Sequence, residues 1–317
     1  MGRRAVRRPA QRPPHARRTD LLLDTPTTLA VLGAALIHAG WNASLKSRGE
    51  PLLESALMHL WLAPVALILL AGLPTPDAFT LACVLASALV HGVYFQVLAA
   101  AYRHADFSIT YPILRGSAPA MTAVGAIFWM HEHPAAQGWL GIAMICVGVV
   151  AMGLLATRMR PSVDSAVQGQ AAQDPAVIRK AIAWALCTAL TIVAYTLIDS
   201  AGVRSAPHAW MYMVWLTLAQ ALVLGTVVLI RSRQTFVAYA RQRGARPMLT
   251  GLALVLSYGI ALWAMTRAPV AAVAALRETS IVFALLIARL LLGERPGAGR
   301  WMAAAVITLG VVVLRTA

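Results

Sequence analysis

The sequence predicts an all-α membrane protein whose ten transmembrane helices form two inverted five-helix repeats. Three observations predict this class. Of the 317 residues, 59% are hydrophobic and only 12% are charged, whereas an ordinary soluble domain has about 25% charged residues. Apolar runs of about 20 residues, the length that crosses about 30 Å of hydrocarbon, follow one another along the chain. The third observation is a sequence pattern that recurs in the two halves.

Ten apolar runs, separated by charged residues or by Pro and Gly, are the predicted transmembrane helices. They cover residues 28–46, 53–72, 79–101, 107–130, 137–157, 180–200, 208–230, 247–266, 269–291 and 299–315. The tail before them contains seven arginines, and we expect it to be disordered. The predicted parts of the chain are 1–27 (basic tail), 28–157 (first repeat), 158–178 (polar linker) and 179–317 (second repeat).

Six residues recur at a constant spacing of 162 positions. They are Leu114, Arg115, Glu132, Pro134, Trp139 and Gly148, which recur as Leu276, Arg277, Glu294, Pro296, Trp301 and Gly310. Identities of such varied types over two helices and a loop indicate an internal duplication. Because five is an odd number, the second unit must enter the bilayer from the side opposite to the first, which is a recurring plan of secondary transporters.

The net charge of +15 does not predict a nucleic-acid partner, because most of the 27 Lys and Arg residues lie in the tail and in short connections between apolar runs. Basic residues in such places bind the headgroups of the lipid bilayer. The alanine-rich and arginine-rich composition is typical of bacterial chains, so we expect a multi-pass protein of the bacterial inner membrane. If the tail is native, the distribution of basic residues favours both termini in the cytoplasm.

Arg115, Arg277 and Arg289 are the basic residues that lie more than one residue inside the ends of the predicted spans. A charge at the centre of a membrane helix costs roughly 2.5–3.5 kcal/mol, so it normally faces a cavity or a partner. Arg289 lies near the end of its span and is expected to extend to the interface. Arg115 and Arg277 either bind an anionic group of a substrate, such as a carboxylate, or act as structural contacts. Glu278 points about 100° away from Arg277 on a helix, so it is expected to contact Arg115 or Arg289, or to carry a coupling proton.

Further substrate-binding candidates are polar and aromatic residues inside the apolar runs. Hydrogen bonding between helices is the alternative role for these residues. Asp199 is the second candidate for a coupling proton, and Pro112 and Pro119 are expected to bend the fourth helix. The candidates for substrate binding are His38, Trp41, Asn42, Tyr94, Gln96, Tyr195 and Tyr258.

No metal or cofactor is predicted. His131-Glu132-His133 contains possible zinc ligands, but the matched positions are Gly293, Glu294 and Arg295, so we interpret this segment as a structural turn. The sequence contains no phosphate-binding loop and no hydrolase motif. An ATP-driven pump and an enzyme are therefore not supported.

From about Leu29 to Leu314 the chain resembles the EamA family of the drug/metabolite transporter superfamily. The resemblance rests on His38-Ala39-Gly40-Trp41-Asn42, Tyr111-Pro112-Ile113-Leu114-Arg115-Gly116, Ala274-Ala275-Leu276-Arg277-Glu278-Thr279-Ser280, and the Glu-x-Pro turns at Glu132 and Glu294. It implies ten helices in two inverted repeats, a central cavity, and transport of small metabolites, often as efflux. Tyr111, which lies in the second motif, joins the substrate-binding candidates. Relatives with these motifs have been associated with phosphonate utilisation.

These observations together predict a secondary active transporter that exports small polar anionic or zwitterionic metabolites by alternating access. Its expected partners are a small-molecule substrate and the lipid bilayer, and it is expected to be a monomer or homodimer. The alternative is a non-transporting membrane scaffold or accessory subunit, which would not need charged residues within its spans. A channel stays open as well, although rings of identical side chains are not apparent in the sequence.

Overall fold

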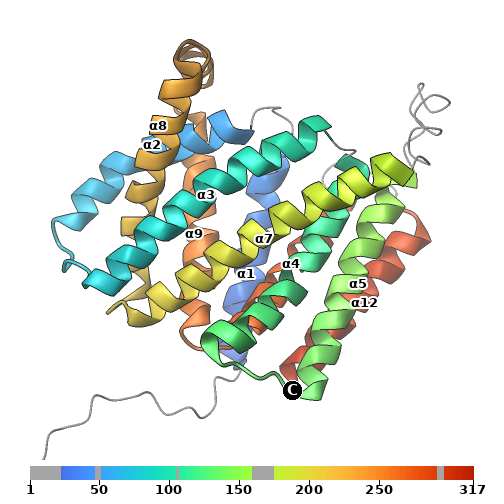
Figure 1. The fold of residues 1–317 in the computed structure, drawn as a ribbon. Coiled ribbons are helices and arrows are strands. Elements are labelled where there is room, and N and C mark those ends of the chain that lie inside the picture. Colours follow the sequence, from blue (N-terminus) through green and yellow to red (C-terminus); the bar gives the residue numbers. More distant parts are fainter. Residues whose placement is uncertain (1–22, 47–50, 105–106, 159–174, 291–295) are drawn as a thin grey trace, which may run out of the picture.

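The computed structural model describes residues 23–46, 51–104, 107–158, 175–290 and 296–317. Every regular element in these ranges is a helix, and the helices pack into one bundle (Figure 1). The first half contains α1 (Thr25–Lys46), α2 (Pro51–Leu70), α3 (Ala78–His104), α4 (Phe107–Met130) and α5 (Ala136–Arg158). The second half contains α7 (Pro175–Ser205), α8 (Ala209–Arg243), α9 (Arg246–Met265), α10 (Val270–Arg277), α11 (Ser280–Leu290) and α12 (Ala298–Arg315).

In the described part of the chain, eight helices are long and apolar enough to cross a membrane. Together α10 and α11 make one of these spans, Val270–Leu290, whereas α1 and α4 are not among the eight. Large apolar side chains also remain on the outside of the bundle, such as Phe128 at 78% exposure and Ile230 at 79%. Lipid accommodates such surfaces, which water-soluble proteins keep small. The chain is therefore a multi-pass membrane protein, and the count of ten spans stays a prediction.

Two helices differ from the predicted runs. The run at 208–230 continues as α8 to Arg243, through a kink at Ser232, whose φ of −149° and ψ of 38° are not helical. Beyond the kink, Phe236 is buried in a cluster with residues of α2, so tertiary packing extends the helix past the apolar run. The run at 269–291 is divided into α10 and α11, whereas α4 is continuous through Pro112 and Pro119.

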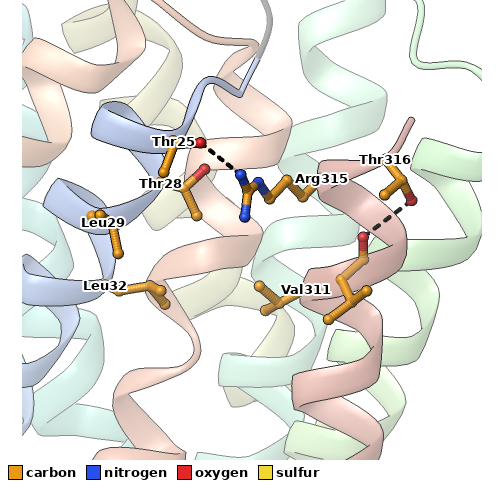
Figure 2. A pocket seen from close by; sticks show the side chains of 8 residues that line it. Thr25, Thr28, Leu29, Leu32, Val311, Arg315 and Thr316 are labelled. Atoms are coloured by element: carbon orange, nitrogen blue, oxygen red, sulfur yellow. Dashed lines mark hydrogen bonds between the residues drawn. The ribbon is translucent and has the colours of Figure 1, made fainter.

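The start of α1 and the end of α12 define one side of the bundle, which we call the terminal side. There Arg315 Nη2 donates a hydrogen bond to Thr25 Oγ1 at 2.6 Å (Figure 2). The start of α5 lies on the same side, because Gln137 Nε2 donates to Thr316 Oγ1 at 2.7 Å. Because α2 begins shortly after α1 ends, its first turn lies on the other side, which we call the opposite side.

Many of the contacts between helices connect the two halves. Contacts join α5 to α12, α2 to α8, α3 to α7 and α1 to α9, and Figure 1 shows α5 and α12 side by side. By their order in each half, α1 corresponds to α7, α2 to α8, α3 to α9 and α5 to α12. Exchanging corresponding helices converts the α3–α7 contact into the α9–α1 contact and leaves the α2–α8 and α5–α12 contacts unchanged. This is the symmetry that a duplicated chain would give.

Glycines allow α5 and α12 to approach closely. A Cβ atom on Gly141 would lie 2.7 Å from the backbone N of Leu314, and one on Gly148 would lie 2.5 Å from Ile307 Cγ1. Small residues permit such close backbone contact between membrane helices. As the contacts move towards the end of α5 they move towards the start of α12, so the two helices are antiparallel.

The contacts between α5 and α12 are also reciprocal. Gly148 approaches Ile307, and Gly310 approaches Ile145, where an added Cβ would lie 2.9 Å from Cγ1. Gly310 follows Gly148 by 162 positions, and Ile307 follows Ile145 by the same number. Replacing each residue by its match 162 positions away therefore converts the Gly148–Ile307 contact into the Gly310–Ile145 contact.

We predict that Gly141→Ala destabilises the protein by about 1–3 kcal/mol, the usual cost of overpacking a tight interface. The added methyl group would meet backbone atoms of Leu314, which cannot turn away as a flexible side chain can. Thermal unfolding of the purified protein in detergent measures the effect. Gly33→Ala is the matched control, because no atom lies within 4 Å of a Cβ added there; equal melting temperatures for the two variants would contradict the prediction.

Candidate functional site

The ninth predicted span is divided by a tight turn at Glu278 and Thr279. Their N–H groups donate to carbonyls three residues earlier, at 3.0 and 3.1 Å, so the helix narrows locally to a 3₁₀ turn. Short 3₁₀ stretches inside a helix often mark a functional hinge. The end of α10 carries partial negative charge beside Arg277, and the start of α11 carries partial positive charge beside Glu278. The two helix ends at the break therefore stabilise both the positive charge of Arg277 and the negative charge of Glu278.

Arg115 extends from α4 to this break. Its Nε lies 3.0 Å from Glu278 Oε2, and its Nη2 donates to Ser280 Oγ at 3.1 Å. The side chains of Arg115 and Glu278 are 16% and 8% exposed, so each reduces the free-energy cost of burying the other. Of the two arginines considered as partners for Glu278, Arg115 is the one observed, and Arg289 is exposed at the end of α11.

Arg277, the sequence counterpart of Arg115, has a different environment. Its guanidinium carbon lies 5.1 Å from the centroid of the Tyr258 ring, in a cation–π contact. Within the described ranges, no carboxylate lies at ion-pair distance from Arg277. Its side chain is half-buried. Asp199 and Glu278 lie within electrostatic range of Arg277, but neither forms an ion pair with it.

Asp199 is fully buried at the hydroxyl end of Tyr258. The Tyr258 hydroxyl donates to Asp199 Oδ2, and the Tyr212 hydroxyl donates to Oδ1 at 2.7 Å. Hydrogen bonds to a carboxylate are stronger than those between neutral groups. Tyr258 thus connects Arg277, through its ring, to Asp199, through its hydroxyl.

Aromatic rings from α3, α7 and α9 lie beside these charges. Tyr195 stacks on His91 with ring centroids 4.0 Å apart, and it contacts Tyr94 and Tyr258 edge-on at 5.8 and 6.3 Å. Tyr94 and Tyr195 also lie within electrostatic range of the α4 guanidinium. Three of the predicted tyrosines are therefore brought together.

The first helix contributes two further predicted residues. His38 and Trp41 contact each other edge-on with centroids 4.9 Å apart, and Trp41 Nε1 donates to Ser257 Oγ of α9 at 3.3 Å. Both Arg115 and Arg277 lie within electrostatic range of His38. The two arginines therefore share one neighbourhood.

The other three predicted substrate-binding residues are Tyr111, Gln96 and Asn42, and the structure places them differently. Tyr111 lies within electrostatic range of the α4 guanidinium. The Gln96 amide is engaged elsewhere, because it accepts a hydrogen bond from Arg231 Nη1 and donates to Gly92 O at 3.1 Å. The side chain of Asn42 lies outside the described residues.

Three residues of the site were missed by sequence reasoning. His91 is an isolated histidine in an apolar run, and the signal that identified His38 would have identified it too. Ser280 lies within a motif already noted, but no sequence rule indicated its contact with Arg115. Tyr212 lies near the start of α8, where an aromatic residue is usually an interface anchor. Only His91 could have been predicted.

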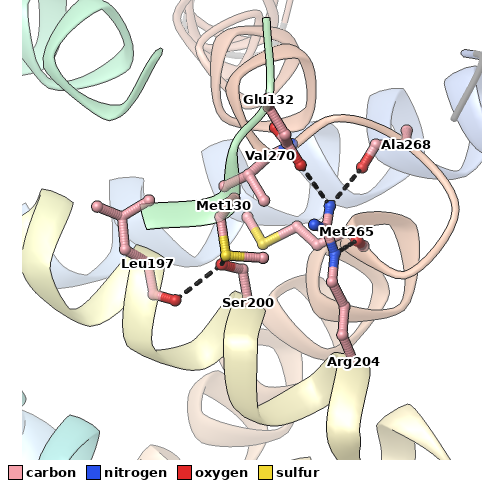
Figure 3. Close-up of polar contacts among 8 residues, drawn as sticks. All are labelled: Met130, Glu132, Leu197, Ser200, Arg204, Met265, Ala268 and Val270. Carbon is pink, nitrogen blue, oxygen red and sulfur yellow. Dashed lines mark hydrogen bonds and ion pairs between the residues drawn. The ribbon is translucent and has the colours of Figure 1, made fainter. Parts of the chain in front are cut away.

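A half-buried ion pair joins the two halves on the terminal side (Figure 3). Arg204 Nη2 lies 2.7 Å from Glu132 Oε1 and donates to Ala268 O at 3.2 Å, while its Nε donates to Met265 O at 2.8 Å. The second Glu132 oxygen accepts the Val270 N–H at 2.8 Å. This terminal-side ion pair connects the turn after α4 to the end of α7 and the start of α10.

The segment around Glu132 has the geometry of a helix C-cap. His131, the residue after α4, has a φ of 55°, the left-handed conformation that commonly ends a helix, and the Glu132 N–H donates to Ala126 O at 3.1 Å. The Glu132 carboxylate is occupied by Arg204 and Val270. The predicted structural turn is therefore observed at this position.

A second ion pair joins the two halves on the opposite side. Arg243 Nη2, at the end of α8, lies 2.9 Å from Glu54 Oε1, in the first turn of α2. The Tyr239 hydroxyl donates to Glu54 Oε2 at 2.5 Å. The Glu54 side chain is 2% exposed. This opposite-side ion pair is the counterpart, across the bundle, of the terminal-side ion pair.

Comparison with solved structures shows that the fold is shared with a known protein. One solved structure, described only as the crystal structure of a protein, superposes with a TM-score of 0.68 over 92% of this chain and 98% of that chain. The two sequences are 16% identical, so this similarity establishes the fold alone. No curated protein matches the sequence.

Comparison with family models gives a match for the second half of the chain. Residues 179–316 match the model of the EamA-like transporter family. This range includes Arg277, Glu278 and Ser280, and several apolar helices able to span a membrane. Over residues 179–316, the chain is therefore similar to the EamA-like transporter family.

Proposed function

We propose that the protein is a secondary active transporter that exports small zwitterionic or anionic metabolites across the bacterial inner membrane. The observation that carries this proposal is the unequal environment of the two arginines. Arg115 is paired with Glu278, whereas Arg277 contacts the Tyr258 ring and has no ion-pair partner among the described residues. A substrate carboxylate binding to Arg277 would supply the missing anion through charge-assisted hydrogen bonds.

Glu278 is suited to couple transport to protons. Its side chain is 8% exposed and lies next to Arg277 in the chain, at the break between two helices. The ammonium group of a zwitterionic substrate and a proton would compete for this carboxylate, so each would leave when the other binds. Mutually exclusive binding is the requirement for exchange of substrate against protons.

The proposed mechanism is alternating access between two inverted repeats. The symmetric pairing of helices and the reciprocal antiparallel contacts of α5 and α12 support the repeat arrangement. The ion pairs Glu132–Arg204 and Glu54–Arg243 support alternation, because each joins the first half to the second at one side of the bundle. In this mechanism one ion pair is broken while the other is kept.

A non-transporting scaffold is the alternative function. It would be stable with apolar residues in place of Arg115, Arg277 and Glu278, since buried ion pairs add little net stability over well-packed apolar side chains. The break between α10 and α11 is also unnecessary in a passive scaffold. Nothing observed favours this alternative over transport.

We predict that Arg277→Gln reduces transport by about 10–100-fold, because a hydrogen bond to a charged group contributes about 1.5–3 kcal/mol. Uptake and efflux of amino acids, organic acids and phosphonates in reconstituted vesicles measure the change. Arg289→Gln is the matched control, since Arg289 is an exposed arginine on the same span. Wild-type rates for a correctly folded Arg277→Gln protein would contradict the proposal.

The role of the two buried acids can be separated by a second comparison. We predict that Glu278→Gln abolishes accumulation driven by a pH gradient but retains exchange of labelled for unlabelled substrate, with weaker substrate binding. The proton site and the charged contact to the substrate ammonium group are lost, whereas Arg277 still binds the substrate carboxylate. Asp199→Asn is expected to retain proton-driven accumulation, because both Asp199 oxygens already accept tyrosine hydroxyls. The reverse result would assign coupling to Asp199, and loss of exchange in both would indicate structural roles.

The two ion pairs between the halves predict opposite effects of two substitutions. Glu132→Gln is expected to increase hydrogen–deuterium exchange of the connection around Met265–Val270 and to leave the start of α9, near Arg246, unchanged. Glu54→Gln is expected to do the reverse, because it removes the ion pair at the end of α8. Each variant serves as the control for the other.

Alternation would be contradicted if either substitution increased exchange equally on both sides. That result would indicate a general loss of stability, which removal of one partner from a buried ion pair can also cause. The double variants Glu132→Gln with Arg204→Gln and Glu54→Gln with Arg243→Gln leave no unpaired charge. They are expected to show the same one-sided increases.

A further inference from the structure

A pocket outside the candidate site lies between the start of α1 and the end of α12. Its volume is about 370 Å³. Figure 2 shows the side chains around it, with Arg315 extending from α12 towards α1. The pocket is lined by Thr25, Thr28, Leu29, Leu32, Val311, Val312, Arg315 and Thr316. None of these residues contributes to the ion pairs of the transport site.

The lining of the pocket is divided between apolar and polar residues. Leu29, Leu32 and Val311 form an apolar surface across the two helices. Thr25, at the start of α1, and Arg315, in the last turn of α12, hydrogen-bond to each other at one end. Such a surface suits a ligand with one charged end and one apolar end.

The pocket opens towards the surface that faces lipid. Leu29 is 63% exposed and Val312 is 53% exposed, so the apolar part of the pocket is continuous with the outside of the bundle. The polar part lies where α1 begins and α12 ends, and the ends of membrane helices normally lie near the lipid headgroups. Arginine at this level binds anionic headgroups.

The charges near the pocket favour an anion. Within the described ranges, no carboxylate lies at ion-pair distance from Arg315. Asp24, which precedes α1, is engaged locally, because hydrogen bonds from Thr27 hold its pKa below its usual value. Arg267 lies within electrostatic range of Asp24. Among the described residues, Arg315 is therefore a cation of this pocket without an ion-pair partner.

We propose that this pocket binds one anionic phospholipid. Its phosphate group would accept hydrogen bonds from Arg315 and Thr25, and an acyl chain would lie along Leu29, Leu32 and Val311. The bound lipid would connect α1 of the first half to α12 of the second. This inference does not depend on the transport proposal, because the two sites share no residue.

The test measures the thermal unfolding of the full chain in detergent with added phosphatidylglycerol, phosphatidylcholine or inorganic phosphate. Phosphatidylglycerol is expected to raise the melting temperature by about 2–4 °C, as a ligand that binds only the folded state does. Inorganic phosphate and phosphatidylcholine are expected to raise it by less than half as much. An equal increase with either of these would overturn the proposal.

Variants distinguish the pocket from general surface charge. Arg315→Gln is expected to lose the increase that phosphatidylglycerol causes, whereas Arg289→Gln, an exposed last-turn arginine of α11, is expected to keep it. Val311→Phe fills the apolar part and leaves Arg315 in place, so it is expected to lose the increase as well. If Val311→Phe or Arg315→Gln responds like the wild-type protein, the proposal is wrong.

Discussion

Burial of a guanidinium group between membrane helices constrains the centre of this molecule. Arg115 can be kept there because Glu278 and Ser280 are brought to it by the break between α10 and α11. That break places Arg277 and Glu278 at the junction of two helix ends. All three ion pairs in the described part of the chain, moreover, join the first half to the second. Relative movement of the halves must therefore exchange these partners.

Apolar contacts between the halves behave differently from the ion pairs. At α5 and α12 the glycines bring backbone atoms into close contact along antiparallel helices, with no charged group between them. A tight apolar interface resists separation, whereas an ion pair can be replaced by water or by a substrate group. The α5–α12 interface is therefore suited to act as the fixed axis, and the ends that carry Arg204 and Arg243 are suited to move.

The sequence predicted much of this organisation, for identifiable physical reasons. Long apolar runs located the helices, and the constant spacing of 162 positions identified Arg115 and Arg277 as matched residues. The sequence could not locate the helix break, since neither Pro nor Gly lies at Glu278–Thr279. Nor could it predict that α8 continues past Ser232, because burial of Phe236 decides this. Spacing along a helix limited the partners of Glu278, but only the packing of α4 selected Arg115.

The unequal roles of Arg115 and Arg277 follow from one departure from the repeat. The position that matches Glu278 in the first half is Gly116. A Cβ atom there would lie 2.3 Å from Val150 Cγ2 and 3.0 Å from the Cys146 carbonyl oxygen, so α5 leaves no space for a second carboxylate. Glu278 is therefore the one acid at these matched positions, whereas both halves carry the matched arginine. Because Arg115 takes that acid, no carboxylate of the described ranges lies at ion-pair distance from Arg277. In the proposed transporter, a bound substrate would supply this anionic partner.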